Sequence, residues 1–386
     1  MKEKNKKEFK SILKNKNGIT LIALVITIIV MLILVGVTIN MVVHGGLFQY
    51  AGNATKETEL AKQKELELSN IESGKDYDYL IDKYTKDETG GDVLTANQEY
   101  TDTNGAKAVI PKGFKLTSAK TVASGLVIED KAGNQFVWIP VTVTGTTDAE
   151  KEASFDALRT TKNDSNYAEP ASGDETEYNA MRTSVINNGG FYIARYEAGH
   201  ATGRLTGASS VSTIPLSKKG AYPYNWVNWS DAKSASQSMY NDSTKYGVKS
   251  TLCYGVQWDA MLSFLGKTSE TDSTAWGNYY NAEPFDFAGE YYKYNDEWKS
   301  DTTSKAKDTD MLLQTGASDR NSLKNIYDVA GNVWEWTMEA NDSSIRVFRG
   351  GNYSNNGDDP ASSRGYDVSP TFSNCTFGFR PTLYIS

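Results

Sequence analysis

The chain has 386 residues, a formal net charge of −8 and only two histidines, His44 and His200. Residues 1–18 contain seven Lys and two Glu, so this segment carries +5 and the remaining residues carry −13. The acidic remainder argues against a polyanionic nucleic acid as a partner, and two histidines exclude a histidine-based metal cluster.

Residues 19–43 form an apolar run without a charged side chain. At ~1.5 Å per residue, a helix of this length crosses a hydrocarbon core of ~30 Å. We therefore expect a basic leader at 1–18 and a membrane-spanning helix at 19–45. Because a Lys-rich flank stays in the cytoplasm, the rest of this single-pass cell-membrane protein would be extracellular. A secretory signal is the competing interpretation, but its apolar region is shorter and ends at a small-residue cleavage site.

The junction between leader and helix reads KNKNG followed by ITLI over residues 14–22. A basic leader, a Gly and a hydrophobic helix start resemble the type IV prepilin signal. This resemblance implies that a prepilin peptidase cuts between Gly18 and Ile19 and methylates the new amine, and that other pilins are partners. The family usually has Glu as its fifth mature residue, paired with a neighbouring subunit's amine, whereas this chain has Ala23. The missing Glu argues against filament assembly, and an uncleaved anchor is the alternative.

Residues 46–95 are expected to form a helical stalk and a linker. The stretch 52–73 is rich in Lys, Glu, Leu and Ala, which favour helix, although its apolar residues form only an irregular stripe. The sequence DETGGD at 87–92 interrupts this pattern and indicates a hinge.

Residues 96–386 are expected to form the outer domain. Aromatic residues are frequent there, Gly, Asn and Ser punctuate the chain, and long helical patterns are scarce. Short strands are predicted at 125–128 and 136–141.

Two helices are predicted in the same domain. Residues 257–265 have apolar side chains at 258, 261, 262 and 265, which is helical spacing. A second helix is expected to start at 228–232 with Ser230 as its cap. The predicted fold class is α+β with much irregular structure.

Seven segments of the outer domain carry a family resemblance in their order along the chain. They are 136–140 (FVWIP), 190–197 (GFYIARYE), 227–232 (VNWSDA), 254–259 (YGVQWD), 325–336 (NIYDVAGNVWEW), 349–353 (RGGNY) and 378–381 (GFRP). Together they resemble the formylglycine-generating enzyme (sulfatase-modifying factor) family over roughly residues 107–386. The resemblance implies a C-type-lectin-like fold.

Most of these segments are interpreted as structural. The Trp residues of 332–336 would bury large apolar areas, and their indole N–H groups need partners. Gly350 and Gly351 allow a positive φ or a close backbone approach, and Arg380 is expected to tie loops together rather than to bind substrate. The resemblance also implies a structural calcium site to which Asn332 and Glu335 would contribute oxygens.

The catalytic residues of the family are missing. Its enzymes oxidise a substrate cysteine with two thiols of their own, which bind copper and follow Gly-Gly-Ser-Tyr/Trp with four residues between them. Asn355 and Pro360 occupy these positions here, and neither supplies a thiolate. Cys253 and Cys375 do not restore the spacing; one disulfide or two buried free thiols are both open for this pair. We expect no catalysis and no catalytic cofactor, with an enzyme of altered chemistry as the alternative.

A binding surface is the function that remains. Residues 352–377 mix Asn, Ser, Asp, Gly, Tyr and Phe, as antibody paratopes do. The predicted ligand-binding residues are Tyr353, Asn355, Asn356, Asp358, Asp359, Tyr366, Asp367, Phe372 and Asn374. The sequence therefore predicts a non-catalytic surface binding protein, an adhesin or minor pilin, whose extracellular ligand is a glycan or a protein. Two alternatives remain: an ordinary solvated loop, and a variable region diversified by a retroelement, which this segment also resembles.

Overall fold

The computed structural model describes residues 93–159, 169–170, 173–203, 213–293, 297–340, 345–365 and 368–386. The contact pattern separates Met1–Lys86 from Asp87–Ser386, and every described residue belongs to the second unit. The predicted leader, membrane helix and stalk up to residue 92 lie outside the described residues, as do Gly18 and Ile19. Among the residues that are described, no helix is both long enough and apolar enough to cross a membrane.

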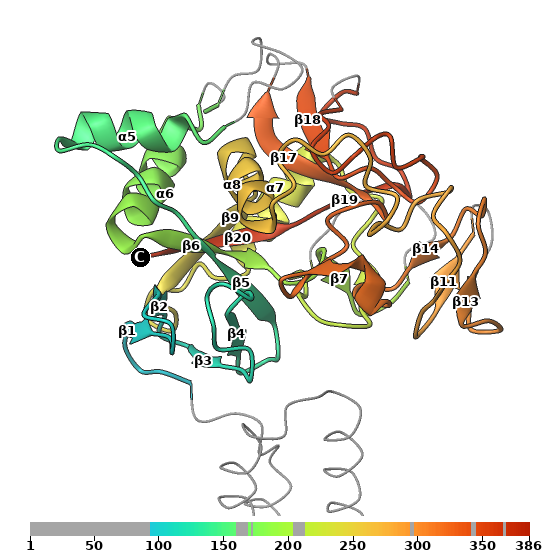
Figure 1. The fold of residues 1–386 in the computed structure, drawn as a ribbon, viewed down its shortest axis with the longest axis horizontal. Coiled ribbons are helices and arrows are strands. Elements are labelled where there is room, and N and C mark those ends of the chain that lie inside the picture. Colours follow the sequence, from blue (N-terminus) through green and yellow to red (C-terminus); the bar gives the residue numbers. More distant parts are fainter. Residues whose placement is uncertain are drawn as a thin grey trace, which may run out of the picture. The chain divides into compact units, whose positions relative to one another are not determined.

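A six-stranded sheet organises the domain, with every neighbouring pair antiparallel (Figure 1). Its order is β3 (Phe114–Leu116), β4 (Val127–Asp130), β5 (Gln135–Pro140), β6 (Gly190–Ala194), β20 (Pro381–Ile385) and β9 (Val248–Leu252). The last strand of the chain therefore lies inside the sheet rather than at its edge. A hairpin of β1 (Gln98–Thr101) and β2 (Lys107–Ile110) precedes this sheet.

Four α-helices are found in the described part of the chain: α5 (Asp148–Asp156), α6 (Glu175–Asn188), α7 (Trp229–Ser238) and α8 (Gly255–Leu265). Helix α6 packs against β6, β20 and α5, whereas α7 contacts β9 and α8 contacts β5. Both α7 and α8 also contact β17 (Trp334–Ala340), so they join the central sheet to a second, smaller one (Figure 1).

The second sheet has the order β18 (Arg346–Arg349), β17 and β19 (Phe377–Phe379). Strand β17 pairs with β18 in the antiparallel sense and with β19 in the parallel sense. The remaining strands form short ladders. These are β7 (Gly199–His200) with β8 (Tyr222–Pro223), β10 (Phe285–Asp286) with β13 (Ser304–Lys305), β12 (Trp298–Lys299) with β11 (Tyr291–Tyr292) and β14 (Leu312–Leu313), and β15 (Ser322–Leu323) with β16 (Ile326–Tyr327). A single-turn 3-10 helix at Asp319–Asn321 precedes β15.

Four predicted elements have counterparts in the structure, but the cap of one predicted helix is a different residue. Strands β4 and β5 and helices α7 and α8 lie where strands and helices were expected. The prediction that Ser230 caps the second helix is wrong. Helix α7 begins at Trp229, and its cap is Asn228, whose Oδ1 accepts a hydrogen bond from the backbone N–H of Asp231 at 2.9 Å.

The aromatic motifs are structural, as predicted. Trp138, Trp258 and Trp336 are fully buried, and Trp334 is 8% exposed. The indole N–H of Trp336 donates to the carbonyl of Val227 at 3.0 Å, so burial leaves this donor satisfied.

Arg380 has the connecting role that was expected. Its guanidinium is fully buried, donates to the carbonyls of Ala194 and Tyr327, and forms an ion pair with Glu335 at 2.6 Å. It thereby joins the central sheet, the β15–β16 ladder and β17.

Candidate ligand-binding site

The predicted binding segment connects β18 to β19, and we call residues 350–376 the display loop. Its first two residues are Gly350 and Gly351, with φ values of 99° and 78°. This left-handed region strains side chains other than glycine. A Cβ on Gly351 would also lie 2.5 Å from Cε1 of Tyr279. Glycine is therefore required where the loop leaves the strand.

Side chains from two other parts of the domain, the segment 279–281 and helix α8, hold the first half of the display loop. The hydroxyl of Tyr279 donates to the carbonyl of Gly350 at 2.7 Å and lies 3.1 Å from that of Asp359. The indole N–H of Trp258, on α8, donates to the carbonyl of Ala361 at 2.9 Å. Oδ1 of Asn281 accepts from the N–H of Gly357 at 3.0 Å. The course of the backbone is thus set by side chains outside the loop.

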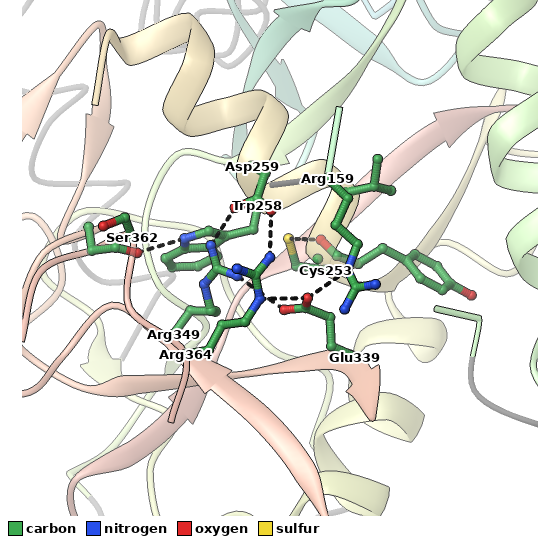
Figure 2. A network of polar contacts seen from close by, with 12 residues as sticks. Arg159, Cys253, Trp258, Asp259, Glu339, Arg349, Ser362 and Arg364 are labelled. Atoms are coloured by element: carbon green, nitrogen blue, oxygen red, sulfur yellow. Dashed lines mark hydrogen bonds and ion pairs between the residues drawn. The ribbon is translucent and has the colours of Figure 1, made fainter. Parts of the chain in front are cut away.

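A buried charged network lies where the display loop meets the core (Figure 2). Arg364 of the loop donates to Asp259 at 2.7 Å and to Glu339 at 2.9 Å. Arg349, the residue before Gly350, pairs with the same two carboxylates, at 2.5 and 3.1 Å. Arg159 also donates to Glu339, at 2.9 Å. Asp259 of α8 and Glu339 of β17 therefore each pair with Arg349, just before the loop, and with Arg364, at the end of its first half.

The electrostatics of this network favour the ionised carboxylate. Burial alone would raise the pKa of Glu339, but Arg349, Arg364 and Arg159 outweigh burial and lower the pKa to about 2. Because buried charges are costly unless paired, separating Arg349 or Arg364 from these carboxylates would be strongly unfavourable. The first half of the loop is consequently anchored to the core at both ends beneath the side chains that it carries.

Three of the predicted ligand-binding residues are exposed on this support: Asn356, Asp358 and Asp359. Partial burial and the adjacent Asp358 raise the pKa of Asp359. Asn355 is half-buried, and its Oδ1 accepts from the N–H of Asn352 at 3.2 Å, so it shapes the turn. This half of the loop offers carboxylate and amide groups to a partner.

The expectation that Tyr353 is an exposed aromatic anchor is wrong. Its side chain is fully buried in a small cluster with Tyr292, Leu312, Val333 and Cys375. The positive φ of the glycine two residues earlier turns the backbone so that this ring enters the core. Tyr353 therefore supports the loop from beneath and does not face a ligand.

The remaining predicted ligand-binding residues lie in the second half of the display loop and differ in their exposure. Phe372 is 37% exposed and stacks edge-on against Phe377, with 5.2 Å between ring centroids. Asn374 is half-buried, and its Oδ1 accepts from the N–H of Cys375 at 2.5 Å. Tyr366 and Asp367 lie outside the described residues.

One exposed aromatic beside the loop was not predicted from the sequence. Tyr280 is 36% exposed, and its backbone N–H donates to the carbonyl of Asn355 at 2.8 Å. Its neighbour Tyr279 is fully buried, so adjacent tyrosines have opposite environments. No sequence pattern distinguishes them, because the contact joins residues that are far apart along the chain.

The described residues of the site hold no reactive thiol pair. Asn355 and Pro360 stand at the expected thiol positions, while Cys253 and Cys375 are both buried and unpaired. Burial raises the pKa of each thiol, which disfavours the nucleophilic thiolate. Within the described ranges, no group of three or more His, Cys, Asp or Glu side chains is placed to hold a metal ion.

Asn332 and Glu335 do not fit the expected calcium site. Oδ1 of Asn332 accepts from Nδ2 of Asn278 and from the N–H of Leu313, at 2.9 and 3.0 Å. Both carboxylate oxygens of Glu335 accept hydrogen bonds from Arg380. A guanidinium occupies the position beside the carboxylate that a cation would take, so these side chains form a protein-internal network.

Comparison with known protein families finds a match that covers the C-terminal half of the chain. Residues 195–383 match the family described as the sulfatase-modifying factor enzyme 1-like domain. No curated protein matches the chain. Among solved structures, variable protein 1 of Treponema denticola is similar at 13% identity, over 75% of this chain and 100% of that chain, with a TM-score of 0.21. The predicted resemblance over 107–386 is thus supported for the part that contains the display loop. Residues 195–383 are thus similar to the sulfatase-modifying factor enzyme 1-like domain.

Proposed function

We propose that this chain is a non-catalytic binding protein of the cell surface that uses the display loop to recognise an extracellular ligand. One observation carries the proposal: Asn356, Asp358 and Asp359 are exposed on a backbone that a buried arginine–carboxylate network and the side chains of Tyr279 and Trp258 hold in place. Rigid support with exposed polar groups lowers the entropy that binding costs. Asn355 and Pro360 at the thiol positions further support binding over catalysis.

The binding test uses the full-length chain in detergent on glycan and protein arrays. The double variant Asn356→Ala/Asp358→Ala should lose a ligand found this way. A matched double variant, Asn241→Ala/Asp148→Ala, removes the same groups from exposed positions outside the loop and should retain it. Equal binding by both double variants would place recognition elsewhere and reject the display loop as the site.

The alternative of an enzyme with altered chemistry makes a different prediction. Such an enzyme would consume oxygen or convert a sulfatase-type cysteine peptide after Cu(I) loading, and Cys375→Ala or Cys253→Ala would abolish turnover. We expect no turnover, because both thiols are buried.

The cell-surface part of the proposal rests on the N-terminal sequence. Processing by a prepilin peptidase would give a mature protein that starts at Ile19 with a methylated amine, and Gly18→Val would block the cut because a branched Cβ crowds the peptide. Mass spectrometry that finds an intact leader on surface-exposed protein contradicts this processing. Ligand binding by the display loop is measured independently of that result.

A further inference from the structure

The exposed residue Asn356 of the display loop is followed by a buried glycine, Gly357. A Cβ on Gly357 would lie 2.1 Å from Oγ1 of Thr274 and 2.4 Å from the backbone nitrogen of the same residue. Glycine is the residue that suits a backbone which approaches other atoms this closely. The packing of the loop against Thr274 therefore places an Asn–Gly pair at the surface of the domain.

An Asn–Gly pair contains both partners of a chemical reaction. The backbone nitrogen of the glycine attacks Cγ of the asparagine, so that a new N–C bond forms and the bond from Cγ to Nδ2 breaks. The proton of the glycine N–H leaves with Nδ2 as ammonia, and the product is a five-membered succinimide ring. Water then opens the ring at either carbonyl, which gives aspartate or isoaspartate. Asparagine is accordingly a thermolabile residue, and glycine has no Cβ that would crowd the ring.

The two partners of this reaction have different surroundings in the display loop. The side chain of Asn356 is exposed and makes no hydrogen bond with another described residue. The attacking nitrogen, by contrast, is engaged, because the N–H of Gly357 donates to Oδ1 of Asn281 at 3.0 Å. While this hydrogen bond persists, the nitrogen keeps its proton and faces Asn281 instead of Cγ of Asn356. The bond must therefore break before the succinimide forms.

Two other Asn–Gly pairs in the described part of the chain, at 104–105 and 188–189, are held differently. In both of them the glycine N–H donates to a backbone carbonyl, within a turn in the first pair and at the C-terminal end of α6 in the second. Substitution of a side chain leaves such an acceptor in place. Among these three pairs, the N–H of Gly357 alone donates to a side chain, so its engagement depends on Asn281.

We propose that Asn356 is a site of spontaneous deamidation and that the hydrogen bond from Gly357 to Asn281 sets the rate of this modification. The product adds a negative charge close to Asp358 and Asp359, and isoaspartate also lengthens the backbone by one carbon atom. Deamidation would thereby change an exposed group of the display loop. This consequence for ligand recognition rests on the proposed function of the loop, whereas the modification itself does not.

Peptide mass spectrometry of the full-length chain, incubated in detergent at mildly alkaline pH, measures the rate of deamidation at each Asn–Gly pair. Asn281→Ala removes the acceptor and should speed up the modification of Asn356 by about fivefold, the factor that corresponds to the ~1 kcal/mol of one neutral hydrogen bond. Asn281→Asp keeps an acceptor oxygen at the same position and should retain the original rate. Asn281→Leu, which is similar in size to asparagine, takes the place of Asn281→Ala if thermal unfolding shows that the alanine variant is not folded.

Two controls separate the effect of this hydrogen bond from a general loosening of the loop. Tyr279→Phe removes a different anchor of the same half of the loop and leaves the acceptor on Asn281, so it should not speed up deamidation of Asn356. The rates at Asn104 and Asn188 should be equal in all variants. An unchanged rate at Asn356 in both Asn281→Ala and Asn281→Leu, or equal acceleration by Asn281→Asp or Tyr279→Phe, overturns the proposal. Because the measured quantity is a mass, the result is independent of whether the display loop binds a ligand.

Discussion

The hydroxyl oxygen of Tyr353 lies 3.5 Å from the sulfur of Cys375, and both side chains are fully buried. The two residues stand near opposite ends of the display loop, so their contact closes the loop from inside. We therefore expect Tyr353→Ala to lower the free energy of unfolding by about 3–5 kcal/mol, as large-to-small core substitutions of aromatic residues do. Tyr353→Phe keeps the ring and should cost no more than about 1 kcal/mol. Urea unfolding of both variants measures this difference, and equal values would show that the ring is not in the core.

Substitutions of exposed residues in the display loop should, unlike Tyr353→Ala, leave the free energy of unfolding almost unchanged. Asn356→Ala and Asp358→Ala each remove a solvent-facing polar group, so each should change the free energy of unfolding by less than about 0.5 kcal/mol. Trp334→Ala, in the core beneath, should cost about 3–5 kcal/mol. Denaturant titrations of the three variants test the contrast. A large loss of stability in either loop variant would mean that its side chain supports the fold.

The buried network makes stability depend on pH in the acid range. The folded-state pKa of Glu339 is about 2, below its ordinary value of 4.5. Since the folded-state pKa is lowered, the stabilisation is present above pH 4.5 and is lost as pH falls towards 2. Glu339→Gln should flatten this part of the curve of unfolding free energy against pH. Glu283→Gln, which removes only an exposed ion pair with Lys307, should keep the slope of the original protein. If Glu339→Gln keeps the same slope as well, another group causes the acid sensitivity.

The cap of α7 gives a test within a single helix. Asn228→Ala removes the side-chain acceptor for the N–H of Asp231 and should cost about 0.5–2 kcal/mol. Ser230, two residues later, is exposed and is not the cap, so Ser230→Ala should stay within about 0.5 kcal/mol. Thermal unfolding of the two variants ranks them directly. A larger loss in Ser230→Ala would restore the cap that the sequence predicted.

Local patterns predicted those elements whose structure depends on neighbouring residues. Helix α8 follows from apolar spacing, and β5 follows from a short apolar run. Two helices were missed although their signals are present. Helix α5 begins with a capping box between Thr147 and Glu150, and α6 ends at Gly189, which has a φ of 72°. Both signals are short and lie next to weakly apolar sequence, so hydrophobic periodicity does not reveal these helices.

The candidate site was predicted less well because its geometry depends on distant contacts. The position of the loop and the absence of the thiol pair were inferred from the resemblance to the formylglycine-generating enzyme family. The burial of Tyr353 could not be inferred, since it depends on Cys375, 22 residues later. The role of Arg364 was likewise hidden, because its partners Asp259 and Glu339 precede it by 105 and 25 positions.

The position of Arg380 between two strands also determines how the domain would respond to mechanical load. A single residue separates β19 from β20, and that residue is locked to Glu335 of β17 while β20 is flanked on both sides by β6 and β9. Tension applied to a ligand on the display loop would therefore pass along β19 into the middle of the central sheet. To extract the chain there, a buried ion pair and two rows of backbone hydrogen bonds must break together.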